Sequence, residues 1–364
     1  MSVLESPWTL PLAGVLAGIA MGFVARRHHF CTMAALERYW YAGDSRGLRT
    51  WILAAAIAIA LSQTFYFAGY ADLRASFYLS PLLGLTGAVI GGLAFGVGMA
   101  LVGTCSFGAL VRTGGGSLNS AVVLIVLGLS ALGAQRGLVA QLRVATVDNL
   151  AIDVSDAGDQ SIGSLLTWAT GLDLAIPTAI VITVALLAWV FSEPSFRRER
   201  GSIATGVVLG AAISFGWLAT TYHLRHSLEV VQIEAGSFVV PLGDTILQFA
   251  TNTGTMPDYG VGLVLGVIMG SALCAWRYKD VRWEACDSAS ELGRHVFGSF
   301  LMGTGGVFAA GCTIGQGVTG FSTLAVSAPV VFISIAIGAK LGLGYLIEGS
   351  VLAGFRSLPR EMVK

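Results

Sequence analysis

The sequence predicts an all-α integral membrane protein, and three observations support that fold class. Of the 364 residues, 55% are hydrophobic and 12% are charged, whereas a soluble globular protein carries about 25% charged residues. The mean hydropathy is +0.76. Nine apolar runs approach the roughly 20 residues that a helix needs to cross a bilayer. Finally, one glycine-rich segment that breaks at a cysteine occurs twice, which is typical of membrane transporters built from repeats.

Each of the nine apolar runs is expected to form a transmembrane helix of one transmembrane domain, residues 1–364. The runs lie at about 10–25, 51–70, 81–103, 119–140, 163–191, 203–221, 259–276, 295–311 and 327–347. Basic residues follow the first run instead of preceding it, which is wrong for a cleaved signal peptide. We therefore expect this first run to be retained as a helix, with lipid around the whole bundle.

The charges in the loops predict the orientation of these helices. Arginines are concentrated in the connections 26–49 and 192–200, whereas 144–160 carries aspartates and no Lys or Arg, and 222–258 is mostly acidic. Basic loops remain on the cytoplasmic side. The N-terminus is then outside and the C-terminus inside, which requires an odd number of spans.

The repeated segment covers residues 96–108 and 303–315. Four positions are identical in the two copies, namely Gly96 with Gly303, Gly98 with Gly305, Cys105 with Cys312 and Gly108 with Gly315. With nine spans, the first copy runs from outside to inside and the second from inside to outside. The two copies are therefore predicted to be inverted, although packing motifs of the Gly-x-x-x-Gly type also align by chance.

The likeness extends beyond these segments, because Gly14 and Gly18 match Gly206 and Gly210. The predicted halves are about 10–140 and 203–347, with a connector helix at about 163–191. Inverted repeats place a substrate site near the middle of the bilayer, where broken helices meet.

Cys105 and Cys312 are the first candidates for a site, because both stand where an apolar helix is expected to break. A cysteine in an apolar run is usually a small hydrophobic residue, but a matched pair at matched breaks favours a shared function. A thiol is a weak donor and a polarizable acceptor, which suits an anion that itself ends in sulfur. Cys31 is a third candidate, at the predicted start of a short re-entrant helix; 222–258 holds no matching cysteine.

Four further residues are candidates beside these cysteines. Thr104 and Gly311 precede Cys105 and Cys312 and are expected to present backbone amides. Arg112 either guides an anion at the inner mouth or is an ordinary interface arginine. Gln316 is either a polar group of the outer copy or a helix-packing residue.

Several classes of function lack support in the sequence. No Cys-x-x-Cys pair occurs and the histidines are scattered, so we expect no metal site. No phosphate-binding loop occurs, so we expect no ATP hydrolysis and no cofactor. The zero net charge indicates no nucleic-acid partner. Cys274, within an apolar run, and Cys286, in a charged loop, are interpreted as structural.

Residues 22–34, 91–114 and 305–317 resemble the YeeE/YedE family of sulfur-compound membrane transporters, and 42–51 resembles a subset of it. The resemblance implies an hourglass-shaped, all-helical protein of the bacterial inner membrane with an inverted repeat. It also implies thiosulfate uptake, with the ion passed between Cys31, Cys105 and Cys312 through S–H···S contacts. Residues 27–30 differ from the Arg-Gly that many members have there, which predicts a different entrance.

We therefore expect a non-enzymatic transporter that takes up thiosulfate through Cys312, then Cys31, then Cys105, and releases it past Arg112. One alternative is a membrane sulfurtransferase or persulfide carrier, and another is a membrane sensor of sulfur compounds. The cargo is alternatively sulfite or a selenium compound. A cytoplasmic sulfur-carrier protein is a candidate partner at the basic face.

Overall fold

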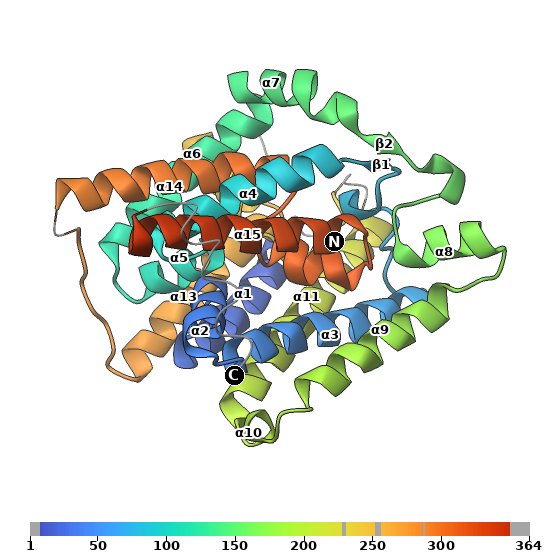
Figure 1. Cartoon of the computed structure of the whole chain (residues 1–364), viewed down its shortest axis with the longest axis horizontal. Helices are drawn as coiled ribbons and strands as arrows, with labels where there is room; N and C mark the ends of the chain where they lie inside the picture. Colours follow the sequence, from blue (N-terminus) through green and yellow to red (C-terminus); the bar gives the residue numbers. More distant parts are fainter. Residues whose placement is uncertain (1–7, 228–230, 252–255, 287, 350–364) are drawn as a thin grey trace.

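The computed structural model describes residues 8–227, 231–251, 256–286 and 288–349, and these residues are mostly helical (Figure 1). The first part of the chain contains α1 (Thr9–Arg27), α2 (Thr32–Ala42), α3 (Arg46–Phe67), α4 (Leu85–Val102), α5 (Ser106–Gly114) and α6 (Leu118–Arg136). The middle contains α7 (Leu138–Thr146), α8 (Ile162–Thr170), α9 (Ala175–Val190) and α10 (Pro194–Arg197). The last part contains α11 (Arg200–His226), α12 (Val240–Ala250), α13 (Tyr259–Arg277), α14 (Ala289–Phe308), the π-helix η5 (Gly315–Gly320) and α15 (Ser327–Glu348).

Short elements complete the described chain. Three 3₁₀ turns are η2 (Phe77–Leu79), η3 (Asp148–Leu150) and η4 (Ser155–Ala157). The strands β1 (Leu82–Leu83) and β2 (Ile152–Asp153) form one small antiparallel pair, with Leu82 opposite Asp153. This pair joins the loop between α3 and α4 to the loop between α7 and α8, and it adds little to the core.

The all-α membrane class is confirmed, whereas the expected count of nine spans is not. Seven helical segments of the described chain are long and apolar enough to cross a membrane. The connector predicted at 163–191 is divided into α8 and α9, because the chain turns at Gly171 with a φ of +74°. Glycine adopts this left-handed conformation readily and commonly ends helices. The second part, α9, has 16 residues.

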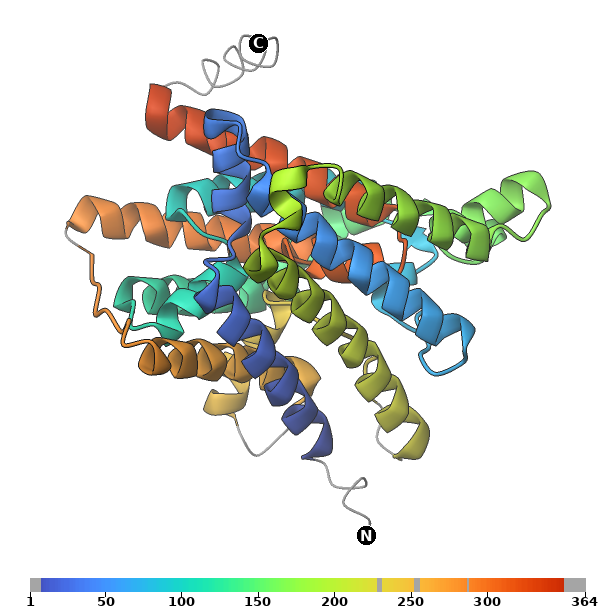
Figure 2. The same ribbon diagram turned by 90° about the horizontal axis from the view of Figure 1, so that it is seen from below.

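The long helices pack in reciprocal pairs between the first and last parts of the chain. Helix α1 lies along α13 while α11 lies along α3, and α4 lies along α15 while α14 lies along α6. Two further contacts, α4 with α14 and α1 with α11, join the pairs at the centre. Figure 2 shows α11 between α1 and α3.

Glycines permit the close approach of these helices. A Cβ atom at Gly18 would lie 2.4 Å from the carbonyl oxygen of Leu263, and one at Gly210 would lie 2.6 Å from that of Ala54. Close backbone contact of this kind is a principal source of helix association in membranes. Gly18 faces α13 and its sequence match Gly210 faces α3, so matched glycines make reciprocal crossings.

Large apolar side chains face outward on the long helices and on α9. Examples are Leu16 at 66% exposure, Ile125 at 54%, Ile180 at 57% and Ile333 at 58%. A protein surface in water rarely carries so many exposed large apolar side chains on a few helices. This surface matches the lipid environment that the composition predicts.

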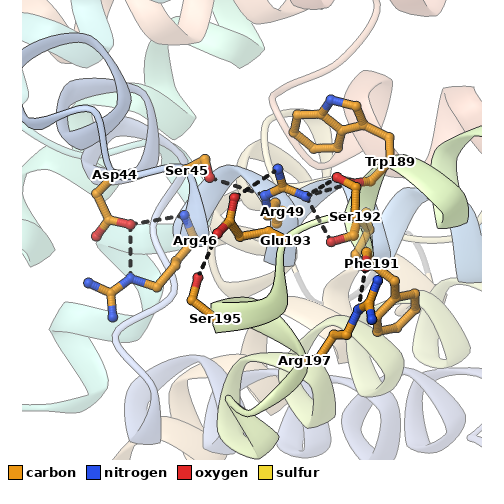
Figure 3. Close-up of polar contacts among 11 residues, drawn as sticks. Asp44, Ser45, Arg46, Arg49, Trp189, Phe191, Ser192, Glu193, Ser195 and Arg197 are labelled. Atoms are coloured by element: carbon orange, nitrogen blue, oxygen red, sulfur yellow. Dashed lines mark hydrogen bonds and ion pairs between the residues drawn. The ribbon is translucent and has the colours of Figure 1, made fainter.

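Arg49, in the first turn of α3, binds the C-terminal end of the connector helix α9 (Figure 3). Its guanidinium donates to the carbonyl oxygens of Trp189 and Val190, at the end of α9, and to the hydroxyl of Ser192 at 3.1 Å. The guanidinium carbon also lies 4.5 Å from the centre of the Trp189 ring. These contacts satisfy carbonyl groups that the end of a helix leaves without partners.

Candidate functional site

The two matched cysteines start helical segments in the same way. After α4 ends, Gly103 turns with a φ of +77° and Cys105 becomes the N-cap of α5. The Cys105 sulfur accepts a hydrogen bond from the Gly108 amide at 3.4 Å, and the Cys312 sulfur accepts one from Gly315 at 3.3 Å. Both thiols therefore occupy the positive N-terminal end of a helical segment.

The two copies differ in the helix that follows the cysteine. Residues after Cys105 form the regular helix α5, whereas residues 315–320 form the π-helix η5. The wider turn appears where Gln316 is buried and bonded back to the preceding break: its Nε2 donates to the carbonyls of Ala309 and Ala310, at 3.1 and 3.0 Å. Departures of this kind are frequent at functional sites.

Cys31 joins Cys105 through a reciprocal set of contacts. The Cys31 sulfur lies 3.7 Å from the Thr104 hydroxyl, and the Cys105 sulfur lies 3.9 Å from the Thr32 hydroxyl. Both sulfurs also lie beside Gly108, since a Cβ atom there would lie 3.5 Å from the Cys31 sulfur and 3.6 Å from the Cys105 sulfur. Each sulfur thus contacts the threonine next to the other cysteine.

Contacts continue from this pair toward Cys312. Thr313, whose buried Oγ1 has no hydrogen-bond partner among the described residues, lies near the thiol of Cys105, while Tyr78 lies within electrostatic range of Cys312. Cys105 therefore stands between Cys31 and the residue beside Cys312. The expected order, with Cys31 between Cys312 and Cys105, stays a prediction.

Cavities reach this layer of thiols from two sides. The first, the Cys31 cavity, has a volume of about 280 Å³ and is lined by Cys31 together with the basic residues His28, His29, Arg38 and Arg46 and the acidic residues Asp44 and Glu199. The second, the Gln316 cavity, has a volume of about 290 Å³ and is lined by Tyr78, Ala310, Gln316 and Arg143 among others. Cys105 and Cys312 are fully buried and line neither cavity.

Several polar atoms of this buried layer lack hydrogen-bond partners among the described residues. They include Ser106 Oγ, Gln316 Oε1 and Trp51 Nε1. Buried polar groups are nearly always paired, so unpaired ones in one region indicate a place for a polar ligand or water. The layer offers donors and acceptors without a fully buried charged residue.

The remaining predicted residues take different positions. Arg112 is exposed, and its Nη2 donates to the Gly103 carbonyl at 3.2 Å, beside the break. Thr104 contributes its hydroxyl to Cys31. The expectation that Gly311 presents a free amide is wrong: its N–H donates to the Gly306 carbonyl at 2.8 Å, which closes the end of α14.

The sequence reasoning missed several polar side chains of the layer. Ser106 and Thr313 directly follow the matched cysteines, so the repeat itself carried a signal for them. Thr32 follows Cys31 in the same manner. Tyr78 and Trp51 lie outside the repeated segments, and their approach to the site depends on the packing of η2 and α3 against η5.

Comparisons with known proteins match most of the chain. A sequence model of the family described as sulphur transport matches residues 27–341, a range that includes all three candidate cysteines. The chain is 26% identical over 325 residues to the thiosulfate transporter TsuA of Escherichia coli (strain K12), which covers 85% of this chain and 87% of that protein. It is 27% identical over 344 residues to the thiosulfate transporter TsuA of Spirochaeta thermophila, which covers 91% and 96% of the two chains.

Proposed function

Because the chain belongs to the sulphur transport family, we propose that it takes up thiosulfate through the layer of buried thiols between its two cavities. The observation that carries the proposal is the reciprocal pair of contacts between Cys31 and Thr104 and between Cys105 and Thr32, close to the buried Thr313 that follows Cys312. Two relatives with this cargo in their names align over most of the chain, which supports thiosulfate over other sulfur compounds.

The proposed orientation places the Gln316 cavity outside and the Cys31 cavity inside a bacterial inner membrane. The N-terminus is then periplasmic and the C-terminus cytoplasmic. The support is the charge of the loops: the Cys31 cavity is lined by arginines and histidines of basic connections.

The proposed architecture is an inverted repeat of residues 10–140 and 203–347. Reciprocal helix pairs support it, because α1 on α13 and α11 on α3 exchange roles when the two halves are exchanged. Matched glycines support it as well: Gly96 contacts α15, and Gly303 contacts α6. A pseudo-two-fold axis would then pass between α4 and α14, close to the thiols.

In the proposed pathway the anion meets Arg143 in the outer cavity and then passes Cys312, Cys105 and Cys31 in that order. The protonated thiols donate weak S–H···S contacts to the terminal sulfur. Hydroxyls such as those of Ser106 and Thr313 serve the sulfonate oxygens. Thiolates would repel a dianion across a short distance in a medium of low dielectric constant, so the thiols stay protonated during transfer. Arg112 then receives the anion at the inner mouth.

Uptake of ³⁵S-labelled thiosulfate into proteoliposomes tests this proposal. Cys312→Ala, Cys105→Ala and Cys31→Ala are each expected to lower the initial rate by roughly 10- to 100-fold, the cost of a lost hydrogen bond to a charged ligand. Cys274→Ala is the matched control, because Cys274 is buried in α13 and lines neither cavity. Full uptake by all three single variants would contradict the thiol pathway.

Counterflow and competition distinguish the alternatives. A sensor binds thiosulfate but shows no exchange of labelled for unlabelled anion across the liposome membrane. A transporter for sulfite or for a selenium compound shows stronger competition by that ion than by thiosulfate. A cytoplasmic sulfur-carrier protein at the basic face remains a proposed partner, for which pull-down with and without the Arg38 and Arg46 side chains is the test.

A further inference from the structure

A cysteine outside the proposed pathway meets a histidine and an asparagine at one end of the bundle. The Cys286 sulfur lies 2.9 Å from Asn119 Oδ1 and 4.0 Å from His295 Nδ1. His295 Nδ1 in turn lies 2.9 Å from Asn119 Oδ1. Cys286 is half-buried and therefore accessible, whereas His295 is 5% exposed and is held in place by the helix α14.

Two helix ends converge on this thiol. Cys286 precedes α14 by three residues, and Asn119 is the second residue of α6. The Leu118 amide at the start of α6 donates to the Glu284 carbonyl at 2.8 Å, which holds the Cys286 segment against that helix end. Helix N-termini carry partial positive charge and stabilise a thiolate.

The charged side chains around His295 are mostly basic. Arg112 of α5 and Arg294 of α14 lie within electrostatic range of the imidazole, as does the carboxylate of Glu291. A half-buried thiol beside an imidazole, near arginines and helix N-termini, is the setting in which cysteines are reactive nucleophiles. This differs from the structural interpretation that the sequence alone suggested for Cys286.

Arg112 connects this cluster to the proposed exit. It donates to the Gly103 carbonyl at the break before Cys105, and it lies within electrostatic range of both Cys31 and His295. Arg112, the proposed exit residue, therefore lies close both to the site of Cys31 and to His295, the histidine beside Cys286. This proximity adds a chemical possibility, since the outer sulfur of thiosulfate is open to attack by a thiolate.

We propose that Cys286 accepts the outer sulfur of thiosulfate at the inner mouth and forms a cysteine persulfide. The proposal rests on the proposed uptake of thiosulfate. The Cys286 thiolate attacks the outer sulfur and forms a new S–S bond. The S–S bond of thiosulfate breaks, and its electron pair leaves with sulfite. No oxidant or reductant is consumed, because the outer sulfur passes from one sulfur atom to another.

His295 and Asn119 prepare the thiol for this step. In the resting site the Asn119 carbonyl oxygen accepts from the thiol and from the imidazole. The thiol loses its proton and the imidazole takes one up at Nε2, the nitrogen that does not contact Asn119, which leaves a thiolate near an imidazolium. After the transfer, the imidazolium returns the proton to the persulfide or to sulfite.

The test uses the full-length protein in detergent, where both faces meet added thiosulfate. The expected result is release of sulfite and a gain of the mass of one sulfur atom on the peptide that contains Cys286. Cys286→Ser is expected to abolish both signals while thiosulfate uptake into proteoliposomes stays within about twofold of wild type, as for a change outside the pathway. Cys274→Ala, the matched control, is expected to keep both activities.

His295→Asn separates an acid–base role from a structural one. At neutral pH it is expected to slow persulfide formation by about 10²-fold, the usual contribution of a general base. The rate is expected to recover near pH 9, above the ordinary thiol pKa of about 8.5, because solvent then ionises the thiol. An unchanged rate at neutral pH, or a loss that does not recover at high pH, would overturn the assigned role.

The two proposals fail in different ways. Uptake of thiosulfate by a wild-type protein that forms no persulfide overturns only the covalent step at Cys286. Persulfide formation in detergent by a wild-type protein that shows no uptake into liposomes overturns the transport proposal. Cys105→Ala is expected to show this second pattern, with uptake lost and the persulfide retained.

Discussion

Cys31 and Thr104 stand 73 residues apart in sequence, yet the Cys31 sulfur lies 3.7 Å from the Thr104 hydroxyl. The relationship is reciprocated, because the Cys105 sulfur lies 3.9 Å from the hydroxyl of Thr32. Two breaks in different helices thus form one site of two thiols and two hydroxyls. The site couples α2 to α5, and buried hydroxyls of Ser106 and Thr313 lie in the same region.

The Thr104 hydroxyl is expected to contribute to the affinity for the anion. Thr104→Val keeps the shape of the side chain and removes the hydroxyl beside Cys31. A typical hydrogen bond contributes about 1 kcal/mol, so we expect the KM of thiosulfate uptake to rise by roughly fivefold. Thr104→Ser, which keeps the hydroxyl, is the control. An equal KM in the valine variant and wild type would show that the hydroxyl does not act on the anion.

Gly96 is expected to be essential for the contact of α4 with α15. A Cβ at this position would lie 2.1 Å from the Ile335 carbonyl oxygen. Gly96→Ala is expected to destabilise the fold by about 1–3 kcal/mol, the usual cost of overpacking, and to lower the midpoint of thermal unfolding in detergent. Gly84→Ala is the control, because nothing lies within 4 Å of a Cβ there. Equal unfolding midpoints for the two variants would contradict the predicted crossing.

Arg49 is expected to hold the connector in place. Arg49→Ala leaves the Trp189 and Val190 carbonyls without their charged donor, and Arg49 itself is only 8% exposed. Loss of such bonds costs about 1.5–3 kcal/mol, so faster proteolysis between α9 and α11 is expected. Arg46→Ala, which removes an exposed ion pair with Glu199, is the control and is expected to change proteolysis little. Similar rates for the two variants would refute the role of Arg49.

Stability is expected to fall as the pH rises, because of Glu234. Burial raises the pKa of this carboxyl well above its ordinary value, and the negative charge of Asp258 adds to the increase. A folded state with a raised acid pKa binds more protons than the unfolded state, so its contribution is present at low pH and is lost as the pH rises toward the raised pKa.

Glu234→Gln is expected to remove this dependence, since an amide does not ionise. The measurement is the thermal unfolding midpoint in detergent between pH 5 and pH 8. Asp156→Asn, on an exposed turn, is the control and is expected to keep the wild-type slope. A Glu234→Gln variant that retains the full slope would assign it to other groups.

The positions of the helices followed closely from the sequence, because lipid imposes a simple length and composition on each of them. The predicted runs 10–25 and 259–276 correspond to α1 and α13. The division of the connector into α8 and α9 was not predicted, since the turn at Gly171 is a local conformation inside an apolar stretch. The prediction of a free Gly311 amide was wrong for a related reason. Whether this amide is free depends on how the last turn of α14 is hydrogen-bonded.

The sequence by itself determined the membrane class, the family and the two matched cysteine breaks. These depend on composition, on local glycine and cysteine patterns and on the repeat, all of which are properties of the sequence itself. Only the tertiary structure decided that Cys31 meets Cys105, that Cys105 stands next to Thr313, and that Cys286 meets His295 and Asn119. Such contacts join side chains from separate helices, and their distances are fixed by how closely glycine-lined helices cross.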